Sequence, residues 1–230
     1  NLLPVHASLE RFANHFSTFG PVQQGYAHFV HGRIAPSTAV PYGFDLDFWS
    51  SSANAPDPRT VVCVATGAAP GNAVHFRKGV DLLIEAAALL PDHRFTIIGA
   101  EDPNAYRDLP INLRMLGKCK PDQLRQELAA HGIYAQPSVM EGFPNALCEA
   151  MLMGCLPVVS SIPSMPEIVH DTGQVIHERT ARQLANAIGA LSALPHDERM
   201  RSRRAAQERI RPFTVERRIA RLLELIPSAM

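Results

Sequence analysis

The stretch VVCVATGAAPGNAVHFRKGVDLLIEAAALLPDHRFTIIG (residues 61–99) decides the fold class. Its first six residues form an apolar, β-branched run that ends at Gly67, which is typical of a buried strand. GVDLLIEAAALL (79–90) carries apolar residues at helical spacing, and Pro91 ends that pattern. RFTIIG (94–99) is a second apolar run. The stretch therefore predicts a strand, a loop rich in Gly and Ala, a helix and a second strand.

The same alternation continues towards the C-terminus. Further strands are predicted at 111–117, 133–138, 156–161 and 174–177, and helices at 121–132, at 145–154 and from about Ala181 onward. Strands that alternate with helices imply parallel crossovers and a sheet covered on both faces. We therefore predict an α/β, doubly wound, Rossmann-like domain with a parallel sheet of order 3-2-1-4-5-6. Its ligand should lie beyond the carboxyl ends of the strands. The Arg-rich segment 199–211 should be helical, with its charged side facing solvent.

Composition narrows the range of partners. The chain has 230 residues, 46% of them hydrophobic, which is enough for a sizeable core. Because its 22 basic and 22 acidic residues cancel, no overall field draws it to nucleic acid. Four cysteines form no C-x-x-C pair, which favours buried thiols in a reducing compartment over a zinc site. Since neither a membrane span nor a signal peptide is visible, we expect a cytoplasmic location.

The segment EGFPNALCE (141–149) is the strongest candidate for a binding site. It follows a predicted strand and opens a predicted helix, which Asn145 is expected to cap. The N-terminus of such a helix attracts anions, phosphate above all. Glu141 and Glu149 are placed to flank a ligand there, and we expect them to accept hydrogen bonds from hydroxyls, since carboxylates repel phosphate. The alternative is that Glu141 caps a neighbouring helix and Glu149 is a surface residue.

A second candidate lies between the first predicted strand and the first predicted helix. Lys78 offers a mobile point charge to a pyrophosphate, and Arg77 offers a planar fork. In doubly wound folds the first loop of this kind carries phosphate contacts. Two cations at a helix start also oppose the helix dipole, which favours an anionic ligand over a solvated surface. The motifs G-x-G-x-x-G, G-K-[ST], G-x-S-x-G and H-E-x-x-H are absent, so the corresponding NAD, P-loop, hydrolase and zinc sites are not predicted.

Four segments together resemble the retaining glycosyltransferases of family 4, which have the GT-B fold, and mainly their C-terminal nucleotide-sugar-binding domain. The segments are EGFPNALCEAM (141–151), RKGVDLLIEAAALL (77–90), the interdomain-like PYGFDLDFW (41–49) and FTVERRIARLL (213–223), similar to the closing helix. The resemblance implies a hexosyltransferase that moves a sugar from a UDP- or GDP-sugar to an acceptor, with retention of anomeric configuration. It implies no cofactor and no metal.

The resemblance also assigns roles to individual residues. Lys78 would neutralise the diphosphate leaving group and Glu141 would bond the transferred sugar, so both are candidate catalytic residues. Glu149 would hold the ribose hydroxyls. The other implied donor-binding residues are Arg77, Gly142, Phe143, Pro144, Asn145 and Ala146, with Gly117 and Lys118 beside the base.

Two positions depart from the family pattern. Where the family often has Gly-Arg after its first strand, this chain has Gly67 followed by Ala68. Either Arg77 substitutes for that arginine or the diphosphate is held less firmly. Where the family often has Gly-Gly, this chain has Pro163 and Ser164, which should stiffen a loop near the donor.

The expected organisation has three parts. Residues 1–43 are interpreted as a remnant of the N-terminal acceptor domain with its linker, 44–212 as the nucleotide-sugar-binding domain, and 213–230 as a C-terminal helix. The chain begins at Asn1 without a Met, so we expect a fragment that binds donor but is inactive alone. His6, His15, His28 and His31 are expected to be loop or surface residues, and the alternative is that one of them touches a substrate.

The expected partners are a nucleotide sugar, the missing N-terminal domain and a glycan, lipid or small-molecule acceptor, with peripheral contact to the cytoplasmic face of a membrane.

Two functional alternatives to a glycosyltransferase stay open. A nucleotide-sugar epimerase of the same fold would need an acid or base beside the sugar, which the sequence does not single out. A degenerate, non-catalytic binding module is the second alternative, and the altered loop after Gly67 is its best support.

Overall fold

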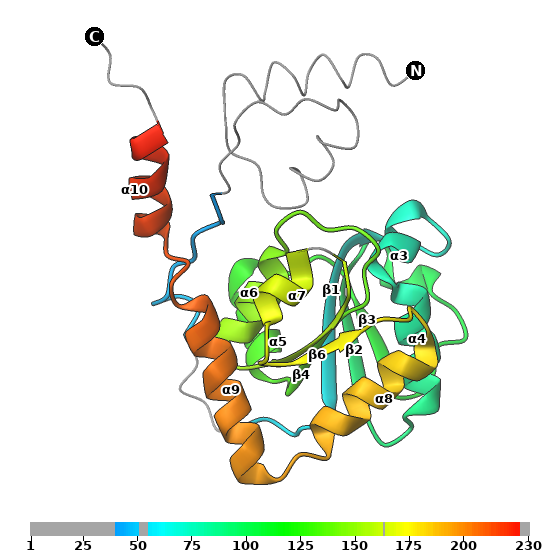
Figure 1. Cartoon of the computed structure of the whole chain (residues 1–230). Coiled ribbons are helices and arrows are strands. Elements are labelled where there is room, and N and C mark those ends of the chain that lie inside the picture. Colours follow the sequence, from blue (N-terminus) through cyan, green and yellow to red (C-terminus); the bar gives the residue numbers. More distant parts are fainter. Residues whose placement is uncertain (1–39, 51–54, 163, 226–230) are drawn as a thin grey trace, which may run out of the picture.

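The computed structural model describes residues 40–50, 55–162 and 164–225 (Figure 1). The expected acceptor-domain remnant before Val40, the four histidines within it and Pro163 lie outside the described residues. The domain is built on one parallel sheet of six strands in the order β3-β2-β1-β4-β5-β6. The strands are β1 (Thr60–Ala68), β2 (Arg94–Ala100), β3 (Leu113–Leu116), β4 (Ile133–Gln136), β5 (Leu156–Ser160) and β6 (Gln174–Ile176). The predicted fold class and strand order are confirmed.

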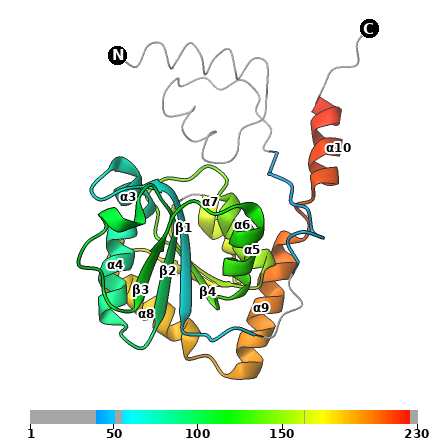
Figure 2. The ribbon, with the colours of Figure 1, turned by 180° about the vertical axis from the view of Figure 1, so that it is seen from behind.

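Helices cover both faces of the sheet, as Figures 1 and 2 show. One face carries α4 and α8, and the other carries α5, α6, α7 and α9. The helices are α3 (Ala73–Lys78), α4 (Val80–Leu89), α5 (Pro121–Ala129), α6 (Asn145–Leu152), α7 (Ser164–Val169), α8 (Ala181–Ser192), α9 (His196–Ile210) and α10 (Val215–Leu225), with a 3-10 turn η1 (Pro103–Ala105). Alternate residues of β1 serve the two cores: Val61 and Cys63 face α4 and α8, while Val62 faces the other layer.

The segment between β1 and α4 differs from its prediction as a loop. It contains α3, which begins where the Asn72 side chain accepts a 2.8 Å bond from the His75 N–H. Gly79, with φ of 73°, ends α3 and begins α4. Arg77 and Lys78 therefore lie in the last turn of α3, where the helix dipole favours cations. The inference of an anionic ligand from an opposed dipole was wrong, because a helix end rather than a helix start carries both side chains.

The junction at Gly79 yields a stability prediction. A Cβ at Gly79 would come within 2.6 Å of the Pro137 carbonyl oxygen, in addition to the cost of left-handed backbone. Gly79→Ala should therefore lower the free energy of unfolding by roughly 3 kcal/mol, measured by denaturant titration. Gly71 has the same φ of 73° with nothing within 4 Å, so Gly71→Ala should cost only about 1 kcal/mol. Equal losses in the two variants would contradict the close approach to Pro137.

The Arg-rich segment forms α9, as predicted. Most of its arginines are exposed, namely Arg201, Arg204, Arg209 and Arg211. Arg199 is half-buried, and Arg203 is buried, with 7% of its surface exposed. The Arg203 guanidinium packs against Gly154, just after α6, where an added Cβ would lie 2.9 Å from it. The expectation of a solvent-facing arginine is wrong at this position, because α9 packs against α6 on that side.

The described chain before β1 meets the segment that leads into α10. The Phe44 N–H donates a 2.8 Å bond to the Phe213 carbonyl, and Phe44 forms a parallel bridge with Thr214. Arg218 of α10 lies 4.4 Å over the Tyr42 ring and donates to the Pro41 carbonyl. From this junction α10 extends away from the sheet (Figure 1). Within the part of the chain that the structure describes, every helix is too short or too polar to cross a bilayer.

Candidate functional site

The two predicted catalytic residues form an ion pair. Lys78 Nζ lies 2.7 Å from Glu141 Oε1, although 63 residues separate them. Their side chains are 17% and 9% exposed, so the pair is largely shielded from water. The backbones also meet, because the Val139 N–H donates a 2.9 Å bond to the Arg77 carbonyl. The structure thus brings the end of α3 and the segment after β4 to one place, beyond the carboxyl ends of β1 and β4.

Glu149 lies in α6, and burial raises the pKa of its carboxyl to about 7. Burial is the one cause of this shift, without a contribution from a neighbouring charge. The nearby hydroxyl of Tyr134 has its pKa raised first by burial and then by the charges of Cys63, Glu141 and Glu149. Both carboxylates therefore act on one buried hydroxyl. Because no neighbouring cation contributes to this shift, the surroundings of Glu149 suit uncharged hydrogen-bond donors better than a cation.

The start of α6 differs by one residue from the predicted capping. Pro144 is the N-cap, because its carbonyl accepts bonds from the N–H groups of Leu147 and Cys148. Asn145 is the first helical residue and is exposed, so the expectation that it caps the helix is wrong. No side chain caps this end. The first backbone N–H groups of α6 are therefore left to a ligand or to water.

Phe143, one of the expected donor-binding residues, has a packing role. Its ring lies 6.0 Å from Tyr42, 6.4 Å from Phe44 and 5.8 Å from Phe213 between centroids. We call these four residues the aromatic cluster. It anchors the loop between Glu141 and α6 to the interdomain-like segment and to the chain leading into α10. The sequence shows several aromatic residues close together in 41–49, but it does not show that they would pack against Phe143 and Phe213.

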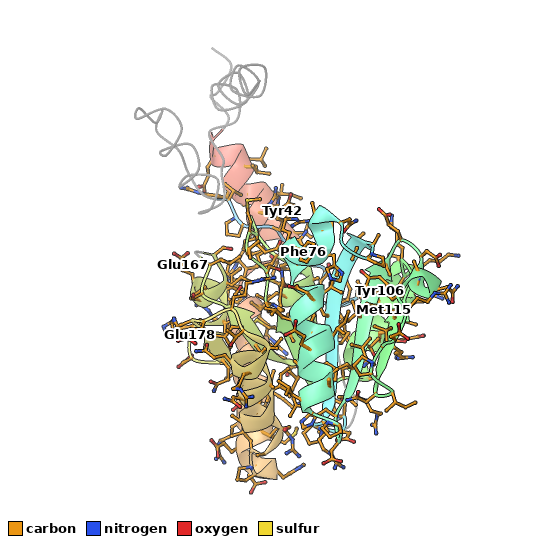
Figure 3. All side chains as sticks on the ribbon, turned by 90° about the vertical axis from the view of Figure 1, so that its right-hand side faces the viewer. Tyr42, Phe76, Tyr106, Met115, Glu167 and Glu178 are labelled. Atoms are coloured by element: carbon orange, nitrogen blue, oxygen red, sulfur yellow. The ribbon has the colours of Figure 1, made fainter. Side chains whose placement is uncertain are left out.

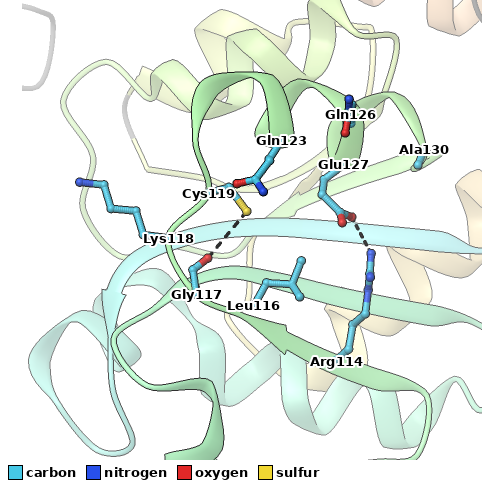
Figure 4. Close-up of a pocket in the computed structure, with 9 residues that line it drawn as sticks. All are labelled: Arg114, Leu116, Gly117, Lys118, Cys119, Gln123, Gln126, Glu127 and Ala130. Carbon is cyan, nitrogen blue, oxygen red and sulfur yellow. Dashed lines mark hydrogen bonds and ion pairs between the residues drawn. The ribbon is translucent and has the colours of Figure 1, made fainter.

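Gly117 and Lys118, the residues expected beside the base, line a groove of about 570 Å³ between β3 and α5 (Figure 4). The Cys119 thiol lies against the Gly117 carbonyl, and an Arg114–Glu127 ion pair borders the groove. The nine lining residues include neither of the acids Glu141 and Glu149 nor Lys78. The structure therefore places the expected base-binding residues in a recess of their own, distinct from the Lys78–Glu141 pair.

Arg179, which no sequence motif indicated, binds the backbone next to the Lys78–Glu141 pair. It lies between β6 and α8 and donates to the carbonyls of Pro137 (3.0 Å) and Phe76 (2.6 Å). Its guanidinium also lies 3.3 Å from Asp81 in the first turn of α4. Phe76 and Tyr42 lie at the same end of the domain, from which α10 extends (Figure 3). Neighbouring sequence could not have revealed these contacts, because they join segments 42 to 103 residues apart.

The chain is similar in sequence to known glycosyltransferases. The family model described as "Glycosyl transferases group 1" matches residues 61–193. A phosphatidylinositol N-acetylglucosaminyltransferase subunit of Arabidopsis thaliana is 31% identical over 133 residues, covering 52% of this chain and 30% of that protein. The putative colanic acid biosynthesis glycosyltransferase WcaL of Escherichia coli K12 is 36% identical over 175 residues, covering 65% and 43%. The chain thus spans less than half the length of these relatives.

Two solved structures with the same fold resemble this chain to a similar degree. Sucrose-phosphate synthase of Thermosynechococcus elongatus has a TM-score of 0.75 at 21% identity, covering 90% of this chain and 56% of that one. Anabaena Alr3699/HepE, solved in complex with UDP and glucose, has a TM-score of 0.74 at 19% identity, covering 92% and 62%. At these identities the likeness establishes the fold. Because the family model spans more than half of its residues, this chain belongs to the glycosyl transferases group 1 family.

Proposed function

We propose that this chain is the donor-binding part of a retaining glycosyltransferase that moves a hexose from a UDP- or GDP-sugar to an acceptor. The observation that carries the proposal is the shielded Lys78–Glu141 pair, together with the partly buried carboxyl of Glu149 in α6. Family membership supports sugar transfer. The fold neighbour solved with UDP and glucose supports a nucleotide sugar as the donor.

In the proposed reaction each charged group has one partner. Glu149 accepts hydrogen bonds from the ribose hydroxyls, and Glu141 accepts them from the transferred sugar. When donor binds, Lys78 exchanges its contact with Glu141 for the diphosphate. As the bond between sugar and diphosphate breaks, Lys78 and the uncapped start of α6 stabilise the charge that develops on the leaving group. Arg77 and the residues 142–146 complete the donor site.

The two alternatives are less well supported. An epimerase would need an acid or base beside the sugar, and the sequence singles out no residue for that role. The relatives from Arabidopsis thaliana and Escherichia coli are also named as transferases. A non-catalytic binding module would keep the donor site without transfer. It is distinguished by assay of the protein together with its acceptor domain.

The remaining partners are part of the same proposal. We propose an acceptor held by an N-terminal domain, of which residues 1–43 are the last part, and a separate C-terminal segment 213–230 that contains α10. A metal is not required in this scheme, because Lys78 and a helix N-terminus supply the positive charge. The four cysteines are free, which supports a cytoplasmic location, and the acceptor would be met at the cytoplasmic face of a membrane.

A thermal-shift screen tests donor binding directly. A UDP- or GDP-sugar at a hundred times its Kd should stabilise the chain by about 2.7 kcal/mol. For a chain of this size that corresponds to roughly 5–10 °C in Tm. The shift should persist in EDTA, and an ADP-sugar serves as the control ligand. Absence of a shift with every UDP- and GDP-sugar would contradict the proposed function, and a shift abolished by EDTA would contradict the metal-free scheme.

A further inference from the structure

One guanidinium holds together the two segments that carry Lys78 and Glu141. Arg179 donates from Nε to the Pro137 carbonyl, at the end of β4, and from a terminal nitrogen to the Phe76 carbonyl, at the end of α3. Lys78 follows Phe76 by two residues, and Glu141 follows Pro137 by four. Arg179 therefore joins the two backbone segments close to Lys78 and Glu141, and it does not contact either of these side chains.

The surroundings of Arg179 leave little slack in this arrangement. Asp81, in the first turn of α4, lies 3.3 Å from the guanidinium. Gly79 packs so closely on Pro137 that a Cβ would meet the Pro137 carbonyl oxygen at 2.6 Å. The Val139 N–H also donates to the Arg77 carbonyl. The two segments are thus held together at several points next to the Lys78–Glu141 pair.

Arg179 suits this task better than a lysine would. A guanidinium is a rigid, planar fork with donors pointing in several directions, whereas an ammonium is a single point charge. Arg179 directs its donors at three acceptors on three segments, the two carbonyls and the Asp81 carboxylate. Its Nε and one of its terminal nitrogens are thus engaged by the protein itself.

We infer that Arg179 is a positioning residue, which sets the separation of the Lys78 ammonium and the Glu141 carboxylate and thereby the hold on the diphosphate. The inference rests on the proposed function. It assigns Arg179 no contact with substrate, so its loss should weaken binding of the diphosphate and leave the ribose contact of Glu149 intact. The diphosphate and the nucleoside should therefore respond differently to its removal.

The test compares Arg179→Met with two controls. Asp81→Asn keeps both carbonyl bonds of Arg179, and Arg182→Met removes an exposed arginine in the first turn of α8. UDP, UMP, GDP and GMP are titrated into each protein by calorimetry. Arg179→Met should lower the affinity for the nucleoside diphosphate about tenfold and the affinity for the matching monophosphate less than about twofold. One charge-assisted contact corresponds to about one decade in affinity. Both controls should bind within about twofold of the parent.

Hydrogen exchange gives a second readout that does not depend on nucleotides. In Arg179→Met the Val139 amide should exchange about tenfold faster. The Leu156 amide, which donates to the Gly132 carbonyl within the sheet, should be unchanged. Equal weakening of diphosphate and monophosphate, or unchanged exchange at Val139, would overturn the positioning role. A parent chain that binds no nucleotide would overturn the proposed function instead, and the role of Arg179 with it.

Discussion

The Lys78→Met substitution is expected to lower the free energy of unfolding by about 3 kcal/mol and to weaken nucleoside diphosphate binding tenfold to a hundredfold. The loss of stability follows from the partner, because Glu141 is 9% exposed and would keep its charge without its cation. The loss of affinity follows from the proposed contact with the diphosphate, a charge-assisted bond of roughly 1.5–3 kcal/mol.

A double-mutant cycle separates these two effects. Glu141→Gln removes the uncompensated charge, so the Lys78→Met/Glu141→Gln protein should recover most of the stability lost by Lys78→Met. It should not recover the affinity for diphosphate. Denaturant titration measures the stabilities and calorimetry the affinities, with Arg204→Met on the exposed side of α9 as the control. Additive losses of stability would show that the ion pair contributes no coupling.

Glu149→Gln should have opposite effects on binding and on stability. Two ribose hydroxyls can give a carboxylate two charge-assisted bonds, and glutamine keeps the shape of Glu149 while weakening both. Affinity for the free nucleoside diphosphate should fall about tenfold to a hundredfold. Glu141→Gln should affect turnover more than nucleotide binding, because its proposed partner is the sugar. Calorimetric titration of both variants tests the assignment, and unchanged affinity in Glu149→Gln would refute the ribose contact.

The stability of the same variant should depend on pH. The pKa of Glu149 is raised from its ordinary value of 4.5 to about 7 by burial, so the folded protein binds the proton more tightly than the unfolded chain. Stability is then lost as the pH rises from about 4.5 to 7, by roughly 3 kcal/mol. Glu149→Gln should be more stable than the parent by about that amount at pH 8 and similar to it at pH 4. A difference that is the same at both pH values would contradict the shift.

The sheet was predictable because its signals are local and strong. Apolar runs such as VVCVAT (61–66) leave few alternatives to a buried strand, and the helices between them dictate parallel pairing. Helix α3 was missed because six residues are too short for periodicity. Pro70 and Gly71 before it read as a loop, and only the caps Asn72 and Gly79 marked its ends.

The candidate site was predictable in its members and not in its contacts. A lysine after β1 and an acid after β4 belong at the same edge of a parallel sheet, which brought Lys78 near Glu141. That they pair at 2.7 Å depends on how the loops close, and no local pattern encodes this. The ring contacts of Phe143 and the three bonds of Arg179 depend likewise on segments that meet only in the folded chain.

The raised pKa of the partly buried Glu149 carboxyl bears on which substitutions evolution would accept at this position. At neutral pH the charge weakens the fold, and only a bound donor would offset that cost. A lineage that stopped binding nucleotide sugars would gain stability from a neutral residue at this position, so drift would tend to remove the acid. The module without a donor should therefore be found among descendants that carry Gln, Met or Leu there. The acid at this position in the present chain is what the proposed contact with the ribose requires.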